Sequence, residues 1–134
     1  MPACLRLFPV SWFLLSALFA IGLPADETSE GLKSGAPLAG QWQRPDGGYV
    51  IEVRSVDPNG TLDAAYFNPR SIRVAAARWR FGAGRLQVRI DLNDRGYEGA
   101  LYLLHYDPEG DRLTGTYRPA NGETFAVEFE RMTP

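Results

Sequence analysis

Residues 99–131 read GALYLLHYDPEGDRLTGTYRPANGETFAVEFER, and this stretch decides the fold of the chain. Apolar and polar residues alternate in three short runs, at 99–106, 112–117 and 124–131. The runs are separated by DPEGD and PANGE. Proline presets a backbone angle, Asn and Asp bond to nearby backbone, and glycine accepts positive φ angles, so both separators are typical of tight turns. The stretch therefore predicts three successive antiparallel strands joined by hairpin turns.

The same rhythm extends back to about residue 38. Turn-forming segments recur at 46–48, 57–60, 82–84 and 93–96, with alternating runs between them. We therefore expect eight strands, near 40–44, 48–56, 61–67, 72–81, 85–92, 97–106, 112–118 and 123–131. Regular spacing and short connections predict an all-β domain over 39–134. Its expected architecture is a single eight-stranded antiparallel up-and-down barrel, because a closed meander has no free edges.

The N-terminal 25 residues differ from the rest of the chain. Arg6 precedes an almost wholly apolar run over 10–23, and an acidic segment follows. This order is typical of a secretory signal peptide, and the run is short for a membrane span. We expect cleavage after Ala25, with cleavage after Ala20 and an uncleaved N-terminal anchor as the alternatives.

A signal peptide predicts a periplasmic or secreted protein with no membrane contact after cleavage. The segment 26–38 is acidic, contains Ser, Gly and Pro, and has no periodicity, so we expect a disordered leader there. The only cysteine, Cys4, lies in the predicted signal, so the exported domain would be held without disulfides.

Charge and residue chemistry exclude several classes of function. The chain carries a net charge of −2, so there is no basic excess to hold phosphates and we expect no nucleic-acid partner. His105 is the only histidine and is predicted to be a residue of the barrel wall, without partners for a metal site. The segment 91–96 has Asp, Asn and Gly at calcium-loop spacing, but Arg95 and Tyr102 replace two ligands, so it is predicted to be a turn. We expect no enzyme, no cofactor and no metal.

Aromatic residues recur on the predicted inward face of the strands. An eight-stranded barrel is just wide enough to be filled by side chains, so these residues either form a packed core or line a cavity whose tyrosine hydroxyls lie near a mouth. Arg70 and Arg73, beside Asn68 in a longer connection, could donate hydrogen bonds to an anionic ligand. The inward aromatic set is Trp42, Tyr49, Tyr66, Trp79, Phe81, Tyr102, Tyr106, Tyr117, Phe125 and Phe129. The candidate ligand-binding residues are Trp42, Tyr49, Tyr66, Asn68, Arg70, Trp79, Tyr102 and Tyr117.

Four apolar residues fall on the opposite, outward phase of their strands: Ile72, Val74, Leu101 and Leu103. A barrel exterior in water should be polar, so these residues are a candidate interface with a second copy or another protein. The alternative is that a β-bulge has shifted the phase of one strand.

Two short motifs carry family resemblances. Gly40-Gln-Trp42 resembles the Gly-x-Trp start of lipocalin and avidin barrels, and Leu113-Thr-Gly-Thr-Tyr117 resembles a strand motif of avidin-like proteins. The run 38–131 is similar in rhythm to small exported bacterial β-barrel proteins. These resemblances imply an avidin- or lipocalin-like barrel with ligand binding at an open mouth. Leu38–Trp42 after a leader also resembles the start of periplasmic metalloprotease inhibitors, whose N-terminal segment enters the protease cleft.

The combined expectation is an exported, non-enzymatic barrel that binds a small apolar or aromatic ligand in its lumen. The alternative is a protein–protein module, such as a periplasmic protease inhibitor or an envelope assembly factor.

Overall fold

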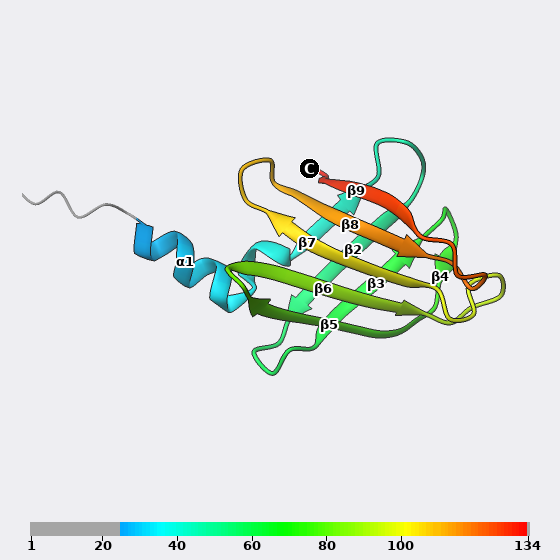
Figure 1. The fold of residues 1–134 in the computed structure, drawn as a ribbon, viewed down its shortest axis with the longest axis horizontal. Helices are drawn as coiled ribbons and strands as arrows, with labels where there is room; N and C mark the ends of the chain where they lie inside the picture. Colours follow the sequence, from blue (N-terminus) through cyan, green and yellow to red (C-terminus); the bar gives the residue numbers. More distant parts are fainter. Residues whose placement is uncertain (1–24, 134) are drawn as a thin grey trace, which may run out of the picture.

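The computed structural model describes residues 25–133 as two short helices followed by nine strands (Figure 1). The predicted signal peptide and both cleavage sites therefore lie, apart from Ala25, outside the described residues. The elements are α1 (Ala25–Ser34), η1 (Ala36–Leu38), β1 (Gly40–Gln43), β2 (Val50–Val56), β3 (Leu62–Phe67), β4 (Ser71–Ile72), β5 (Val74–Gly82), β6 (Arg85–Leu92), β7 (Leu101–Asp107), β8 (Arg112–Arg118) and β9 (Phe125–Arg131).

All nine strands belong to one antiparallel sheet in the order β4-β3-β2-β1-β9-β8-β7-β6-β5. The first and last strands are neighbours in the middle of this order, with Trp42 of β1 opposite both Ile51 and Arg131. The two ends of the order approach each other through a bridge between Thr61 and Arg78. The backbone N–H of Trp79 also donates to the carbonyl of Gly60 at 2.9 Å. The protein is therefore an all-β, nearly closed antiparallel barrel.

The prediction of eight strands is wrong because the expected strand at 72–81 is divided. β4 pairs with β3, whereas β5 pairs with β6. Between them, the N–H of Arg73 donates to the Asp94 carboxylate at 2.8 Å, and its carbonyl accepts the N–H of Asn93 at 3.0 Å. Because both backbone groups of Arg73 bond to a loop and not to a strand, the ladder is interrupted at this residue.

A register irregularity between Val74 and Ala76 explains a second correction. Such an irregularity reverses the in–out phase of the residues before it. Ile72 is consequently 2% exposed and belongs to the core, and Val74 packs against the core. Leu101 is 5% exposed and Leu103 is 46% exposed. The four residues therefore form no exposed apolar patch. For Ile72 and Val74, the alternative interpretation of a β-bulge is the correct one.

The barrel interior is filled by side chains. Inward residues alternate along the strands as expected, and those of β6 are the clearest example. Of the predicted inward aromatics, Trp42, Tyr66, Tyr102 and Phe129 are fully buried. Phe125 is the exception, 49% exposed, because β9 begins at this residue and the end of the barrel lies open around it.

The leader differs from the disordered segment that the sequence predicts. Its first part is helix α1, in which Glu30 and Lys33 form an exposed ion pair at 3.4 Å. Its second part, η1, buries Leu38 completely. Gly35 has φ 73°, and a Cβ there would lie 2.8 Å from Val56 and 3.1 Å from the Trp79 ring. The leader is thus packed onto one end of the barrel, where only a glycine fits.

Candidate functional site: a tyrosine-lined barrel mouth

A pocket of about 480 Å³ lies among the β1–β2, β3–β4, β6–β7 and β8–β9 connections. Figure 1 shows that these connections are at the end of the barrel opposite α1. Turns and strand ends from five parts of the chain converge there, because every second hairpin of a meander turns at the same end. We call this pocket the mouth. It is lined by Arg44, Asp46, Tyr49, Tyr66, Asn68, Tyr97, Tyr117, Phe125 and Ala126.

Tyr66, Tyr97 and Tyr117 of the mouth form one connected cluster with Tyr102 behind them. The hydroxyls of Tyr66 and Tyr102 are 2.9 Å apart and hydrogen-bonded. The ring of Tyr102 lies 4.6 Å from that of Tyr117, and the ring of Tyr66 lies 6.1 Å from that of Tyr97 at a steep angle. The amide of Asn68 donates to the Tyr97 hydroxyl. These tilted and edge-on contacts are the favourable geometries for aromatic pairs.

Burial raises the pKa of three phenols of this cluster. Loss of solvent raises the pKa of Tyr66 and of Tyr102 above the ordinary value of a tyrosine, and it raises the pKa of Tyr117 to about 12. At neutral pH each hydroxyl can therefore donate one hydrogen bond and accept others.

Arg44 places a positive charge at the rim of the mouth. Its guanidinium lies 4.3 Å from the centre of the Tyr49 ring, a cation–π distance. The same group binds both carboxylate oxygens of Asp46, and this pairing lowers the pKa of Asp46. Arg44 is 16% exposed whereas Asp46 is 61% exposed. The arginine is therefore fixed over the mouth, while its carboxylate partner lies outside and could be exchanged for an acidic group on a ligand.

The mouth ends at the buried tyrosines. Below Tyr102, the side chains of Trp42, Leu113 and Phe129 have no exposed surface, and the Tyr102 and Phe129 rings meet edge-on at 5.5 Å. A molecule in the mouth would thus rest on aromatic edges and would not enter the centre of the barrel.

The structure brings together half of the residues that the sequence proposes as ligand contacts. Tyr49, Tyr66, Asn68 and Tyr117 line the mouth, and Tyr102 lies directly behind it. The mouth residues that sequence reasoning missed are Arg44, Asp46, Tyr97, Phe125 and Ala126. Phe125 could have been included, because the alternation of its strand places it on the inward face. The residues in turns have no periodicity from which the direction of their side chains could be predicted.

The other three proposed residues lie elsewhere. Trp42 is deep in the core, and its indole N–H donates to the Leu38 carbonyl at 3.0 Å. Trp79 is near the opposite end, where its indole N–H donates to the Asp57 carbonyl at 2.8 Å. Arg70 points toward the loop after β6, with its guanidinium 3.1 Å from the Arg95 carbonyl. Simple alternation fixes only the face of a strand, so it could not tell the two ends of the barrel apart.

The remaining sequence candidates have local structural partners. His105 faces outward and shares a hydrogen bond of 2.9 Å with the Thr114 hydroxyl on β8. In the predicted turn after β6, the Asp94 carboxylate accepts the backbone N–H groups of Arg73 and Arg95. Within residues 25–133 no group of three or more His, Cys, Asp or Glu side chains could hold a metal ion. None of the helices in this part of the chain is both long and apolar enough to cross a membrane.

Comparison of the chain with protein-family models, with curated proteins and with solved structures gives no significant match.

Proposed function

We propose that this protein is an exported, non-enzymatic barrel that binds a small aromatic molecule at the tyrosine-lined mouth. The observation that carries the proposal is the exposed Phe125 ring beside a cluster of neutral tyrosines, with Arg44 fixed above them. An aromatic ring can pack against Phe125 and Tyr117, while an acidic substituent meets Arg44. The preferred ligand class is therefore an aromatic acid or phenol.

The filled interior refines the expected binding position. Within the described part of the chain, eleven large side chains are essentially without solvent exposure, so a ligand in the lumen would have to displace packed core residues. Binding at the mouth requires no such displacement. The nearly closed barrel and the Gly40-Gln-Trp42 start support an avidin- or lipocalin-like classification, with the division of β4 from β5 as the departure.

The test is a titration of the 15N-labelled protein, residues 26–134, with 4-hydroxybenzoate, phenol and cyclohexanecarboxylate. We expect amide shifts at 44–49, 66–68, 97 and 117–126, largest for 4-hydroxybenzoate because it combines a ring with a carboxylate. Phe125→Ser should weaken this binding several-fold. Leu103→Ser is the matched control, since Leu103 is similarly exposed at 46% but lies on the outer face. Absence of shifts at the mouth, or equal binding by the two variants, would refute the proposal.

A protein–protein module is the second candidate, based on the leader before β1. In α1 the side chains of Glu30 and Lys33 are exposed, whereas η1 is anchored by Leu38. Deletion of residues 26–31 therefore removes part of α1 and keeps the anchor. An inhibitor acting through its leader would lose activity on deletion, and a mouth-binding protein would keep its affinity for 4-hydroxybenzoate.

A further inference from the structure

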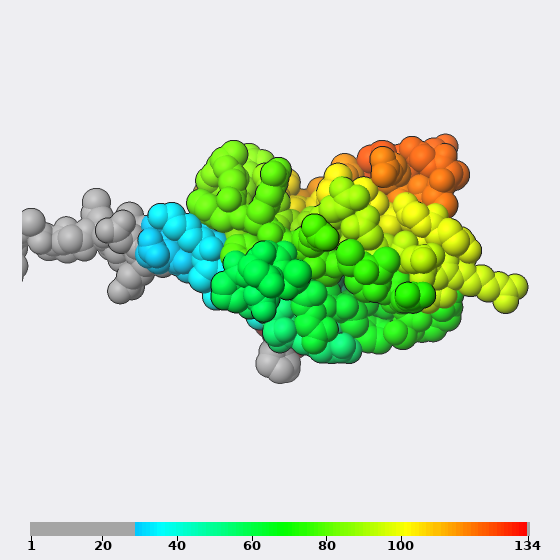
Figure 2. All heavy atoms as spheres, turned by 90° about the horizontal axis from the view of Figure 1, so that it is seen from below, coloured from blue at the N-terminus to red at the C-terminus, as the bar shows by residue number. Residues whose placement is uncertain are grey.

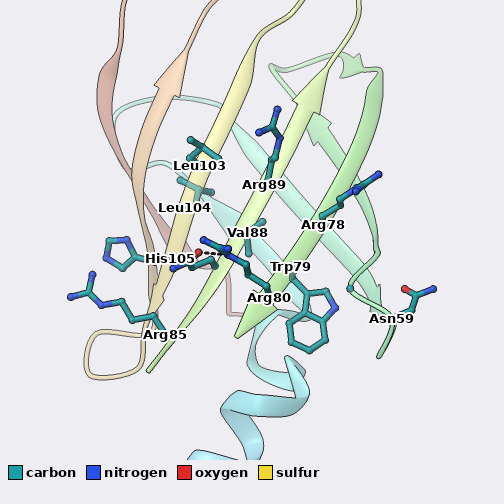
Figure 3. Close-up of a pocket in the computed structure, with 12 residues that line it drawn as sticks. Asn59, Arg78, Trp79, Arg80, Arg85, Val88, Arg89, Leu103, Leu104 and His105 are labelled. Atoms are coloured by element: carbon teal, nitrogen blue, oxygen red, sulfur yellow. Dashed lines mark hydrogen bonds between the residues drawn. The ribbon is translucent and has the colours of Figure 1, made fainter. Parts of the chain in front are cut away.

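A second and larger hollow, of about 750 Å³, lies on the outer surface over β5, β6 and β7, away from the mouth. Outward side chains of these strands line it, together with the turn at Asn59 and Gly60 and the buried Trp79, Val88 and Leu104 at its floor. Figure 3 shows the arginines of β5 and β6 projecting from this face. In Figure 2 the upper outline dips between the light green atoms near the β5–β6 hairpin and the orange atoms near the β8–β9 connection. We call this hollow the arginine groove, with Arg78, Arg80, Arg85 and Arg89 as its cations.

The strand register places like charges together in the arginine groove. Arg78 is directly opposite Arg89 across the β5–β6 pair, an arrangement that destabilises a sheet. Arg89 binds Asp91 at 3.0 Å, and Arg80 donates to the Gln87 amide oxygen at 2.6 Å. Among residues 25–133 no salt bridge is formed by Arg78, Arg80 or Arg85. In a chain of net charge −2, this face is a local positive site, and among the described residues Arg89 is the only one of its four cations with a carboxylate partner.

The spacing of these groups fits an extended ligand. Side chains on one face of a strand repeat about every 7 Å, and neighbouring strands are about 4.8 Å apart. Arg85, Gln87 and Arg89 thus follow one another along β6 over roughly 14 Å, with Arg80 and Arg78 alongside on β5. Opposite Gln87 on β7 lies His105. Cations alternating with neutral hydrogen-bonding groups match a polymer in which acidic groups alternate with hydroxyls.

The groove is less suited to other polyanions. Single-stranded nucleic acid needs exposed aromatic rings for base stacking, but Trp79, the only Phe, Tyr or Trp among the described residues that line the groove, is 9% exposed. An acidic peptide gains its backbone hydrogen bonds at a sheet edge, whereas the arginines project from the face of paired strands. A lipid surface is broad and flat, whereas the arginine groove is a hollow.

We propose that the arginine groove binds a linear acidic polysaccharide, with its carboxylate or sulfate groups on Arg78, Arg80, Arg85 and Arg89 and its hydroxyls on Gln87 and His105. This site is separate from the mouth and does not depend on the function proposed for it.

The experiment is a calorimetric titration of the protein, residues 26–134, with an oligogalacturonate at low and at physiological salt. Arg78→Gln with Arg89→Gln removes the two opposed charges. Arg73→Gln with Arg95→Gln is the matched control, because it removes the same charge from two exposed arginines outside the groove. We expect salt-sensitive binding that falls at least about tenfold in the groove variant and changes less than about twofold in the control.

Four outcomes would overturn the proposal. They are absence of binding to oligogalacturonate, equal loss in both double variants, equal binding of a neutral galactan, and tighter binding to poly-L-glutamate, oligothymidylate or phosphatidylglycerol vesicles. Unfolding would not explain a loss of binding, because removal of opposed like charges should not lower the thermal midpoint of the groove variant. The mouth variant Phe125→Ser should retain full affinity for the oligogalacturonate, which separates this site from the proposed aromatic site.

Discussion

Replacement of Arg131 by methionine should destabilise the barrel more than any other single change at a surface charge. Arg131, at the end of β9, donates hydrogen bonds to the segment that precedes β1. Its guanidinium donates to the carbonyls of Ala39 at 2.8 Å and Pro37 at 2.6 Å, and to the Asp111 carboxylate at 2.7 Å. It also lies 4.2 Å from the centre of the Trp42 ring. Methionine keeps most of the aliphatic stem and removes all four interactions.

The magnitude follows from these contacts. Each charge-assisted hydrogen bond to a backbone carbonyl contributes about 1–1.5 kcal/mol, and a partly desolvated cation–π contact adds about 1 kcal/mol. The Asp111 pair adds less than about 0.5 kcal/mol, because this carboxylate is 47% exposed. Since the contacts share one group and are not additive, we expect a loss of about 3 kcal/mol in the free energy of unfolding. That loss corresponds to a fall of roughly 10–20 °C in Tm.

The assay is urea unfolding at pH 7, followed by far-UV circular dichroism. Asp111→Asn removes only one contact and should cost less than about 1 kcal/mol. Arg118→Met, at an exposed arginine of β8, is the control and should have little effect. The Arg131 guanidinium also lowers the pKa of Asp111, so the stability from this pair is lost as the pH falls through that lowered pKa. A loss below about 1 kcal/mol, or one equal to that of Arg118→Met, would refute this account of Arg131.

Three further changes test other parts of the fold. Gly115→Ala should lower the free energy of unfolding in urea by more than about 3 kcal/mol, because its Cβ would lie 2.0 Å from the Leu103 carbonyl oxygen. Gly48→Ala, with open space around it, is the control, and similar losses in the two variants would contradict the steric argument. Stability should be unchanged from about pH 7 to about pH 10 and then fall as the pH rises toward 12, because the half-buried Tyr117 has a pKa raised to about 12 and deprotonates first in the unfolded chain. Tyr117→Phe should reduce this fall in the urea midpoint, and an unchanged slope would count against the argument. Leu103→Glu, at a residue 46% exposed, should change the free energy of unfolding by less than about 0.5 kcal/mol, and a large loss in the same assay would show that this side chain is covered.

The barrel could be predicted because strand period and turn chemistry are local properties. The alternation over 85–92 and the glycines of the 82–84 turn fix β6 and its hairpin without knowledge of the remaining chain. The division of the strand at 72–81 could not be predicted, since Ala75, Ala76 and Ala77 fit either face and carry no signal of a bulge. The leader has no regularly spaced apolar residues, so there was no helical periodicity from which α1 could be predicted.

The mouth could be predicted only in part for a similar reason. Tyr49, Tyr66 and Tyr117 are in or beside alternating runs, so their inward direction could be inferred from phase. Arg44 and Tyr97 lie in connections, where the direction of a side chain depends on the turn geometry and on contacts distant in sequence. The position of Arg44 over the Tyr49 ring therefore required the structure.

The meeting of β1 with β9 in the middle of the sheet has a consequence for the order of folding. Most strand pairs here join neighbours along the chain, which form early because only short loops have to close. The β1–β9 pair joins residues about ninety positions apart through two register pairs, Trp42–Arg131 and Gln43–Glu130. We expect this pair to form after the transition state, so that Arg131→Met accelerates unfolding and leaves the refolding rate nearly unchanged. The N-terminal and C-terminal meanders would then fold as separate local units, and closure of the chain upon itself would be the final event.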